Sequence, residues 1–160
     1  MRQMIQVKSE EGKFKFRVSG ILKSGNKILT VDMDNSGFLC LPGGYVELGE
    51  DTETALLREM KEEVKYSITV DRCIAIIENF FVNKKGITMH EVAFYYLLTT
   101  KDDDIQDYSS VENDNGGIIN HSFHWINLDE IAQMDFRPAI LKEKLSNHDF
   151  SLSHIIYKEN

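Results

Sequence analysis

Three glutamates on one short stretch of the chain have a spacing that brings carboxylates together on a helix. Glu59 lies three positions before Glu62 and four before Glu63. At about 100° per residue, their side chains share one helix face about 100° wide, beside an apolar stripe. Carboxylates this close repel one another, more strongly at the edge of a low-dielectric core. A hard divalent cation such as Mg²⁺ relieves this repulsion, and it completes its shell with water and substrate phosphates. An ordinary solvated acidic face is the alternative for the three glutamates taken alone.

The residues around the glutamates predict a helix that follows a glycine-rich loop. Asp51 is the expected N-cap, and the apolar spacing predicts a helix from Asp51 to about Val64. Before it, Gly43 and Gly44 allow the backbone to approach a ligand closely, so that amide and carbonyl groups can point at a metal or a phosphate. The loop and the helix therefore indicate the same phosphate and metal chemistry.

The spacing counted from Gly44 resembles the signature of the Nudix hydrolases, G-x5-E-x7-R-E-U-x-E-E-x-G-U, where U is apolar or aromatic. The matching residues are Gly44, Glu50, Arg58, Glu59, Met60, Glu62, Glu63 and Tyr66. The mismatch is Lys65, which stands where the family has its second glycine. A residue with a Cβ costs roughly 1 kcal/mol where the backbone needs a positive φ. Either the helix ends differently in this chain or that strain is tolerated.

The resemblance implies a fold and an activity. The expected fold class is α/β, a Nudix-type α/β/α sandwich with a mixed β-sheet, forming a single domain over residues 1–160 with a core at about 14–146. The implied activity is metal-dependent hydrolysis of a pyrophosphate bond in a nucleoside diphosphate linked to another group, such as a nucleoside triphosphate or a nucleotide sugar. The alternative is a non-catalytic Nudix-like domain that binds a nucleotide or regulates through it; the complete set of three glutamates favours the enzyme.

The resemblance also implies roles for individual residues. Glu59, Glu62 and Glu63, with the backbone carbonyl of Gly44, are the expected ligands of Mg²⁺, with Mn²⁺ as the alternative metal. Arg58 is expected to hold Glu50 and so to fix the loop, rather than to pair with Glu62 on the surface.

The general base varies within the family, so several glutamates stay open for that role. The candidates are a helix carboxylate, Glu112 and Glu91. Glu112 is preferred to Glu91 because its segment is expected to be a loop, which can reach over the helix; an ordinary solvated loop residue is the alternative for Glu112. Glu47 either contacts the metal or favours the positive end of the helix.

The remaining elements are expected from periodicity and turn residues. Segment 102–120 carries six acidic residues, no basic residue and the pair Gly116-Gly117. This composition predicts a long irregular loop. We expect the loop to close over the substrate and to bring Glu112 to the attacking water. Residues after Ser146 are predicted to be a polar tail. The expected strands are 3–7, 14–22, 27–33, 38–41, 67–81, 87–99 and 121–126, and short helices are expected after Asn127 and over 139–145.

Composition excludes other classes of protein. The net charge of −8 lacks the basic face of a nucleic-acid module, so no DNA binding is expected. The two cysteines have no metal spacing, and no apolar run approaches the ~20 residues that span a bilayer. A cytoplasmic protein without membrane contact, acting on a small nucleotide as a monomer or homodimer, is the expectation.

Outside the signature, the sequence is less specific. His90, His121 and His124 have no shared ligand spacing and are predicted to be structural. The aromatic residues of the long strands belong mostly to the core, although one or two could stack on a nucleobase. The proline that many ADP-ribose hydrolases of the family carry shortly after the signature is absent, which leaves the substrate open.

Overall fold

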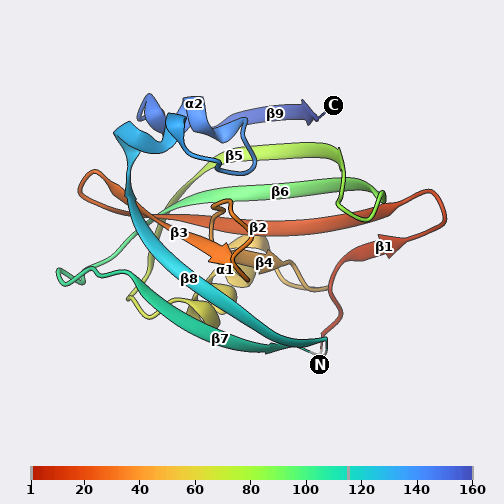
Figure 1. The fold of residues 1–160 in the computed structure, drawn as a ribbon, viewed down its shortest axis with the longest axis horizontal. Helices are drawn as coiled ribbons and strands as arrows, with labels where there is room; N and C mark the ends of the chain where they lie inside the picture. The colour runs from red at the N-terminus through yellow and green to blue at the C-terminus, as the bar shows by residue number, and fades with distance from the viewer. Residues whose placement is uncertain (1, 115, 160) are drawn as a thin grey trace.

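The computed structural model describes residues 2–114 and 116–159, and its centre is a mixed β-sheet (Figure 1). In these residues nine strands pair in the order β7-β8-β3-β2-β6-β5-β9, with β1 and β4 also paired to β2. The strands are β1 (Gln6–Lys8), β2 (Lys13–Ser24), β3 (Lys27–Met33), β4 (Gly43–Tyr45), β5 (Thr69–Val82), β6 (Thr88–Thr99), β7 (Tyr108–Asp114), β8 (Gly117–Asn127) and β9 (Ser153–Lys158). The helices are α1 (Thr52–Glu63), the 3-10 helix η1 (Leu128–Gln133) and α2 (Leu141–Ser146).

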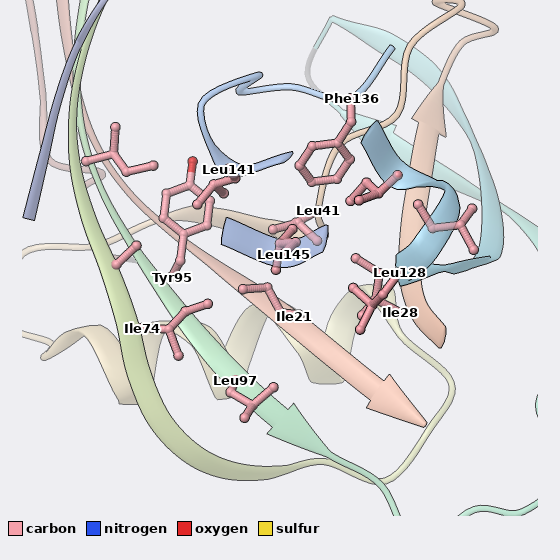
Figure 2. Packing of buried hydrophobic residues seen from close by; sticks show 14 of the residues in the cluster. Ile21, Ile28, Leu41, Ile74, Tyr95, Leu97, Leu128, Phe136, Leu141 and Leu145 are labelled. Carbon is pink, nitrogen blue, oxygen red and sulfur yellow. The ribbon is translucent and has the colours of Figure 1, made fainter. Parts of the chain in front are cut away.

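The two faces of the sheet bury two separate apolar cores, because side chains alternate along each strand. On one face, Leu56 and Met60 of α1 pack in a cluster with Val18 of β2. On the other face, α2 and η1 cover Ile21 and the neighbouring apolar residues of β5 and β6, as Figure 2 shows. The predicted fold class, an α/β/α sandwich around a mixed sheet, is confirmed.

The long central strands were predicted well, since each carries a continuous apolar or alternating pattern. Strand β2 runs parallel to β6 along its length, while β5 and β6 form an antiparallel hairpin. At that hairpin the Asn83 side chain accepts hydrogen bonds from the backbone N–H groups of Lys85 and Ile87, at 2.9 and 3.0 Å. Strand β3 has the predicted bounds, and the predicted 14–22, 67–81, 87–99 and 121–126 overlap β2, β5, β6 and β8.

Helix α1 begins and ends through ordinary local chemistry. Asp51 is the N-cap, as predicted, and its side chain accepts a hydrogen bond from the Thr54 N–H at 2.8 Å. At the other end Val64 is already extended, with φ −112° and ψ 131°. In the described part of the chain Lys65 is not among the residues with positive φ. The helix therefore ends without the turn that needs the family's second glycine, and the strain expected at Lys65 does not arise.

The prediction of a long irregular loop over 102–120 is wrong. Most of the segment is the β7–β8 hairpin, in which Tyr108 to Asp114 pair with Phe123 to Gly117; Asn115, which the loop prediction also covered, lies outside the described residues. Figure 1 shows the hairpin as a long curved arm at one side of the sheet. Tyr108 anchors it by stacking on Phe123 with ring centroids 4.6 Å apart. Strand β7 lies at the edge of the sheet and is mostly exposed. Its sequence is therefore polar and lacks the apolar alternation from which a strand is predicted.

The prediction of a polar tail after Ser146 is also wrong. Residues 153–158 form β9, which pairs in parallel with β5 at the other edge of the sheet. The turn that leads to it is held by Lys144, whose Nζ donates to the Ser151 carbonyl and the Ser153 hydroxyl.

Smaller differences concern element bounds. The first strand is 6–8 rather than 3–7, and α2 begins at Leu141 rather than at residue 139. Segment 38–41 contains isolated bridges at Leu39 and Cys40 rather than a strand. The element after Asn127 is a 3-10 helix, capped by the Asn127 side chain as its sequence indicates. In the parts of the chain that the structure describes, no helix is long and apolar enough to cross a membrane.

Candidate active site

Arg58 is the centre of the polar contacts between α1 and the loop before it. Its Nη2 donates to Glu50 at 2.6 Å and to the Tyr45 carbonyl at 3.0 Å, while its Nε lies 3.3 Å from the second Glu50 oxygen. Its Nη1 donates to Glu59 at 2.8 Å and lies 3.7 Å from Glu47. The predicted contact of Arg58 with Glu50 is therefore present. None of the ion pairs among the described residues joins Arg58 to Glu62.

Glu50 is fixed by this contact as a buried carboxylate. Its side chain is 1% exposed, and one oxygen also accepts the Glu47 N–H at 2.8 Å. The hydrogen bond from Arg58 lowers the pKa of Glu50, and the bond to Glu50 raises the pKa of Arg58. The pair therefore ties the loop of residues 45–50 to the helix as a charged, two-pronged contact.

Gly44 lies directly against the carboxylate of Glu59. Strand β4 pairs with β2, so that Gly44 is opposite Val18, and α1 packs above it. A Cβ added at Gly44 would overlap the carboxylate carbon and both carboxylate oxygens of Glu59. A side chain at this position would displace the Glu59 carboxylate, whereas glycine leaves its backbone beside that carboxylate. Burial raises the pKa of Glu59, although Arg58 opposes this shift.

Glu63 lies one turn further along the helix than Glu59. Burial, followed by repulsion from Glu59 and Glu112, raises its pKa to about 8. Glu62 is exposed on the adjacent part of the helix, and its charge contributes to the raised pKa of Glu59. Burial and neighbouring carboxylates thus disfavour the ionised form of both Glu59 and Glu63.

These residues fit a hard divalent cation in their chemistry. Carboxylate oxygens and a backbone carbonyl are the ligands that Mg²⁺ and Mn²⁺ prefer, and the raised pKa values mark charge that a cation would neutralise. Within residues 2–114 and 116–159, no three acidic, histidine or cysteine side chains lie close enough to form a ready-made metal site. The three glutamates are neighbours along α1, and their carboxylates are not already gathered around one point.

Strand β7 brings Glu112 to this helix from far along the sequence. The Tyr108 hydroxyl at the start of β7 accepts a hydrogen bond from the backbone N–H of Lys65, just after α1, at 3.3 Å. The charge of Glu112 on the same strand contributes to the raised pKa of both Glu59 and Glu63. Its side chain is half exposed, and its Oε2 lies 3.4 Å from Nε2 of the buried His121 on β8. Among the described residues that nitrogen has no hydrogen-bond partner. His121, predicted to be structural, therefore lies next to Glu112, a carboxylate outside α1 whose charge acts on Glu59 and Glu63.

Glu91 lies in a different place from Glu112. It is opposite Asn79 in the β5–β6 pairing and forms an ion pair with Lys15 at 3.9 Å. It lines a cavity of about 600 Å³ on the face of the sheet opposite α1. The sheet side of this cavity is formed by Arg17, Ser19, Asn79, Phe81, Glu91 and Tyr95, and its other walls include Phe38, Cys40, Leu41, Arg137 and Pro138.

Arg17 links the cavity to the carboxylates. It lies on β2 opposite Tyr45 of β4, next to the loop that precedes α1. The carbonyl of Tyr45 accepts a hydrogen bond from Arg58, so β4 connects the cavity-lining Arg17 to the polar contacts of α1. The cavity and the carboxylates therefore form two adjoining parts of one candidate site.

Comparisons with known proteins agree with this geometry. The profile of the Nudix domain matches residues 14–145. A protein of Methanocaldococcus jannaschii named ADP-ribose pyrophosphatase is 49% identical over 84 residues, which are 51% of this chain and 48% of that protein. The match thus spans about half the length of that relative.

Two solved structures have a similar fold. One is a MutT protein from Bacillus halodurans, with a TM-score of 0.63, 18% identity and coverage of 89% of both chains. The other is a UDP-X diphosphatase, with a TM-score of 0.61 and 18% identity over 92% of this chain and 69% of that chain. The fold and the matched profile assign the chain to the Nudix family.

Three polar residues of the site were missed by sequence reasoning. Arg17 and Asn79 lie within ordinary strand patterns, and His121 has no ligand spacing with another histidine. Only the pairing of β2, β5, β6, β7 and β8 brings them to the cavity and the carboxylates.

The contact between Arg58 and Glu50 generates a stability prediction. Replacing Arg58→Ala should lower the free energy of unfolding by about 2 kcal/mol at pH 7, because the buried Glu50 carboxylate then keeps only a longer ion pair, 3.8 Å from the exposed Arg2. Arg58→Lys should recover only part, since an ammonium cannot make the two-pronged contact. Glu50 has a folded-state pKa below its ordinary 4.5, so the stabilisation is present above pH 4.5 and is lost as pH falls through the lowered pKa. Urea unfolding at pH 7 and pH 4 measures this; an equal loss for Arg58→Ala at both values would contradict it.

The raised pKa of Glu63 generates a second stability prediction, for the protein in EDTA. Between pH 4.5 and about 8 the folded protein keeps a proton on Glu63 that the unfolded chain has released, so stability falls as pH rises across this window. Glu63→Gln removes this loss. The variant should match the wild type at pH 5 and be more stable by about 2 kcal/mol at pH 8, measured by urea unfolding. Glu53→Gln, at the exposed start of the same helix, is the control and should behave alike at both values. A Glu63→Gln variant with no pH-dependent gain would refute the burial of this charge.

Proposed function

We propose that this protein is a divalent-metal-dependent hydrolase that cleaves a pyrophosphate bond in nucleoside diphosphate derivatives. The observation that carries the proposal is the set of carboxylates on α1, in which Glu59 lies against Gly44 and both Glu59 and Glu63 have raised pKa values. Ionising these carboxylates together is costly unless a cation binds there. Membership of the Nudix family supports the same reaction.

In this proposal Glu59, Glu62 and Glu63, with the Gly44 carbonyl, hold Mg²⁺ or Mn²⁺. A divalent cation supplies neutralisation of the diphosphate charge and activation of water. Arg58 positions Glu59 through its 2.8 Å hydrogen bond and keeps the loop of residues 45–50 against the helix through Glu50. Arg58 therefore orients a ligand and the loop together rather than touching the reacting atoms.

We assign Glu112 as the general base that takes the proton from the attacking water. It is the carboxylate from outside α1 whose charge acts on both Glu59 and Glu63, and half of its side chain is exposed to solvent. Glu91 fits this role less well, because it is paired with Lys15 in the cavity. His121, 3.4 Å from Glu112, supports the position of that carboxylate. A helix glutamate stays as the alternative base.

The cavity of about 600 Å³ is the proposed seat of the nucleoside. Proteins with a similar fold include a UDP-X diphosphatase and an ADP-ribose pyrophosphatase. The fold alone therefore does not identify the group attached to the diphosphate. The relative from Methanocaldococcus jannaschii makes ADP-ribose the first compound to test, with UDP-glucose and the nucleoside triphosphates beside it.

The proposal is tested by hydrolysis of this panel with Mg²⁺, Mn²⁺ or EDTA. Turnover should require the metal, and Glu62→Gln and Glu63→Gln should each lower kcat by about 100-fold or more, because several kcal/mol of charge stabilisation depend on the metal. Glu53→Gln, on the same helix, should keep wild-type activity. Turnover in EDTA, or full activity in both variants, would exclude the mechanism. Nucleotide binding without any turnover would instead favour the non-catalytic domain.

The role of Glu112 is tested separately. Glu112→Gln should lower kcat by about 100-fold while KM changes little, because a base acts in the transition state. The control is Asp103→Asn, an exposed carboxylate in the segment before β7, which should be nearly silent. If Glu112→Gln is as active as the control, the base is a helix glutamate or Glu91.

A further inference from the structure

Two polar atoms in the cavity wall are shielded from solvent and have no partner within the described residues. They are Nε of Arg17 and Oδ1 of Asn79. Asn79 is 8% exposed, and its β5 neighbours on the same face, such as Ile77, are fully buried. Buried donors and acceptors are nearly always paired, because an unpaired one costs about 1–3 kcal/mol. A donor and an acceptor left open in one cavity indicate a ligand that carries the opposite groups.

Nearby acids do not satisfy Arg17. Glu91 attracts it and contributes to its raised pKa, yet the ion pair that Glu91 forms is with Lys15, at 3.9 Å. Among the described residues no ion pair or hydrogen bond includes the Arg17 side chain. The Arg17 side chain thus lines the cavity from β2, opposite Tyr45, whose carbonyl is hydrogen-bonded to Arg58 of α1. An anion bound there would be next to the metal-binding carboxylates without occupying their place.

Asn79 lies deeper along the same face of the sheet, opposite Glu91 on β6. Both present acceptor oxygens to the cavity, which suits a ligand group that donates. The cavity walls suit a flat ring, because Phe81 lines one side and Phe38 another. The Arg137 guanidinium lies 4.0 Å from the centre of the Phe38 ring and extends this flat surface. A base with an exocyclic amino group offers two N–H donors to these acceptors, whereas uracil offers one ring N–H flanked by two carbonyls, which the acceptors disfavour.

We infer that Arg17 and Asn79 are the residues that select the substrate: Arg17 binds the phosphate next to the nucleoside, and Asn79 accepts a hydrogen bond from the amino group of the base. The inference rests on the proposed function for the placement of the diphosphate. It predicts a preference for adenine nucleotides over uracil nucleotides, since uracil has no exocyclic amino group. Neither residue belongs to the signature of the family on α1 and its loop.

The test is calorimetric binding of ADP, UDP and adenosine to the full chain in EDTA, with wild type and variants. ADP should bind more tightly than UDP and than adenosine. Arg17→Met should weaken ADP about 10-fold or more, as expected for a lost charge-assisted hydrogen bond, and leave adenosine unchanged. Asn79→Ala should weaken ADP and leave UDP nearly unchanged, which removes the preference for adenine. Lys101→Met, which removes one exposed positive charge away from the cavity, is the control for net charge.

A structural role for Arg17 gives the opposite pattern. If Arg17 only balances the charge of Glu91 and Glu63, Arg17→Met lowers the melting temperature of the free protein and leaves the ADP affinity unchanged. If our inference is correct, Arg17→Met does not lower the melting temperature, because the Arg17 side chain makes no hydrogen bond or ion pair within the described residues. Equal binding of ADP and UDP by the wild type, or ADP no tighter than adenosine, would also overturn it.

The outcome is independent of the hydrolysis assay. The binding experiment contains no metal and no turnover, so a failure of the proposed hydrolase leaves its result standing. If the enzyme hydrolyses nucleotides but both variants bind ADP like the wild type, only the assignment of Arg17 and Asn79 is wrong.

Discussion

Repulsion among carboxylates at the edge of a buried core is the constraint on which the rest of the site depends. Glu63 is partly buried at the end of α1, and its neighbours Glu59 and Glu112 oppose its ionisation rather than support it. The positive charge of Arg58 on α1 is already paired with Glu50 and Glu59. The protein thus stabilises the loop with its arginine and leaves Glu63 without a counter-charge of its own on the adjacent helix turn. The cost of ionising Glu63 there is the physical basis of the proposed cation site.

Two distant parts of the chain are needed to complete this arrangement. Strand β4 places Gly44 against Glu59 because β4 pairs with β2, and a larger residue at Gly44 would displace the Glu59 carboxylate. The β7–β8 hairpin adds Glu112 and the buried His121. The central strand β2 contacts both the loop and the cavity, since Arg17 is opposite Tyr45 on one side and Ala93 on the other. The sheet therefore fixes the distance between helix α1 and the cavity.

Local signals in the sequence predicted the features that depend on short stretches of chain. The Asp51 cap and helix α1 follow from local spacing, the contact of Arg58 with Glu50 was implied by the resemblance of the same short segment to the Nudix signature, and each is present. Strands β7 and β9 were missed because edge strands are polar and their partners, β8 and β5, lie elsewhere in the sequence. The open polar atoms of Arg17 and Asn79 have no sequence signal at all, since being unpaired is a property of the packed structure.

This division between local and distant contributions has a functional meaning. The loop and α1 supply the carboxylates from one continuous segment, so their geometry can be kept while the rest of the sheet changes. The cavity is different, because each of β2, β5 and β6 contributes single residues to it from the face opposite α1. A substitution at a position such as Asn79 would therefore alter the cavity without moving a carboxylate of α1, because the α1 carboxylates and the cavity residues lie on different segments of the chain.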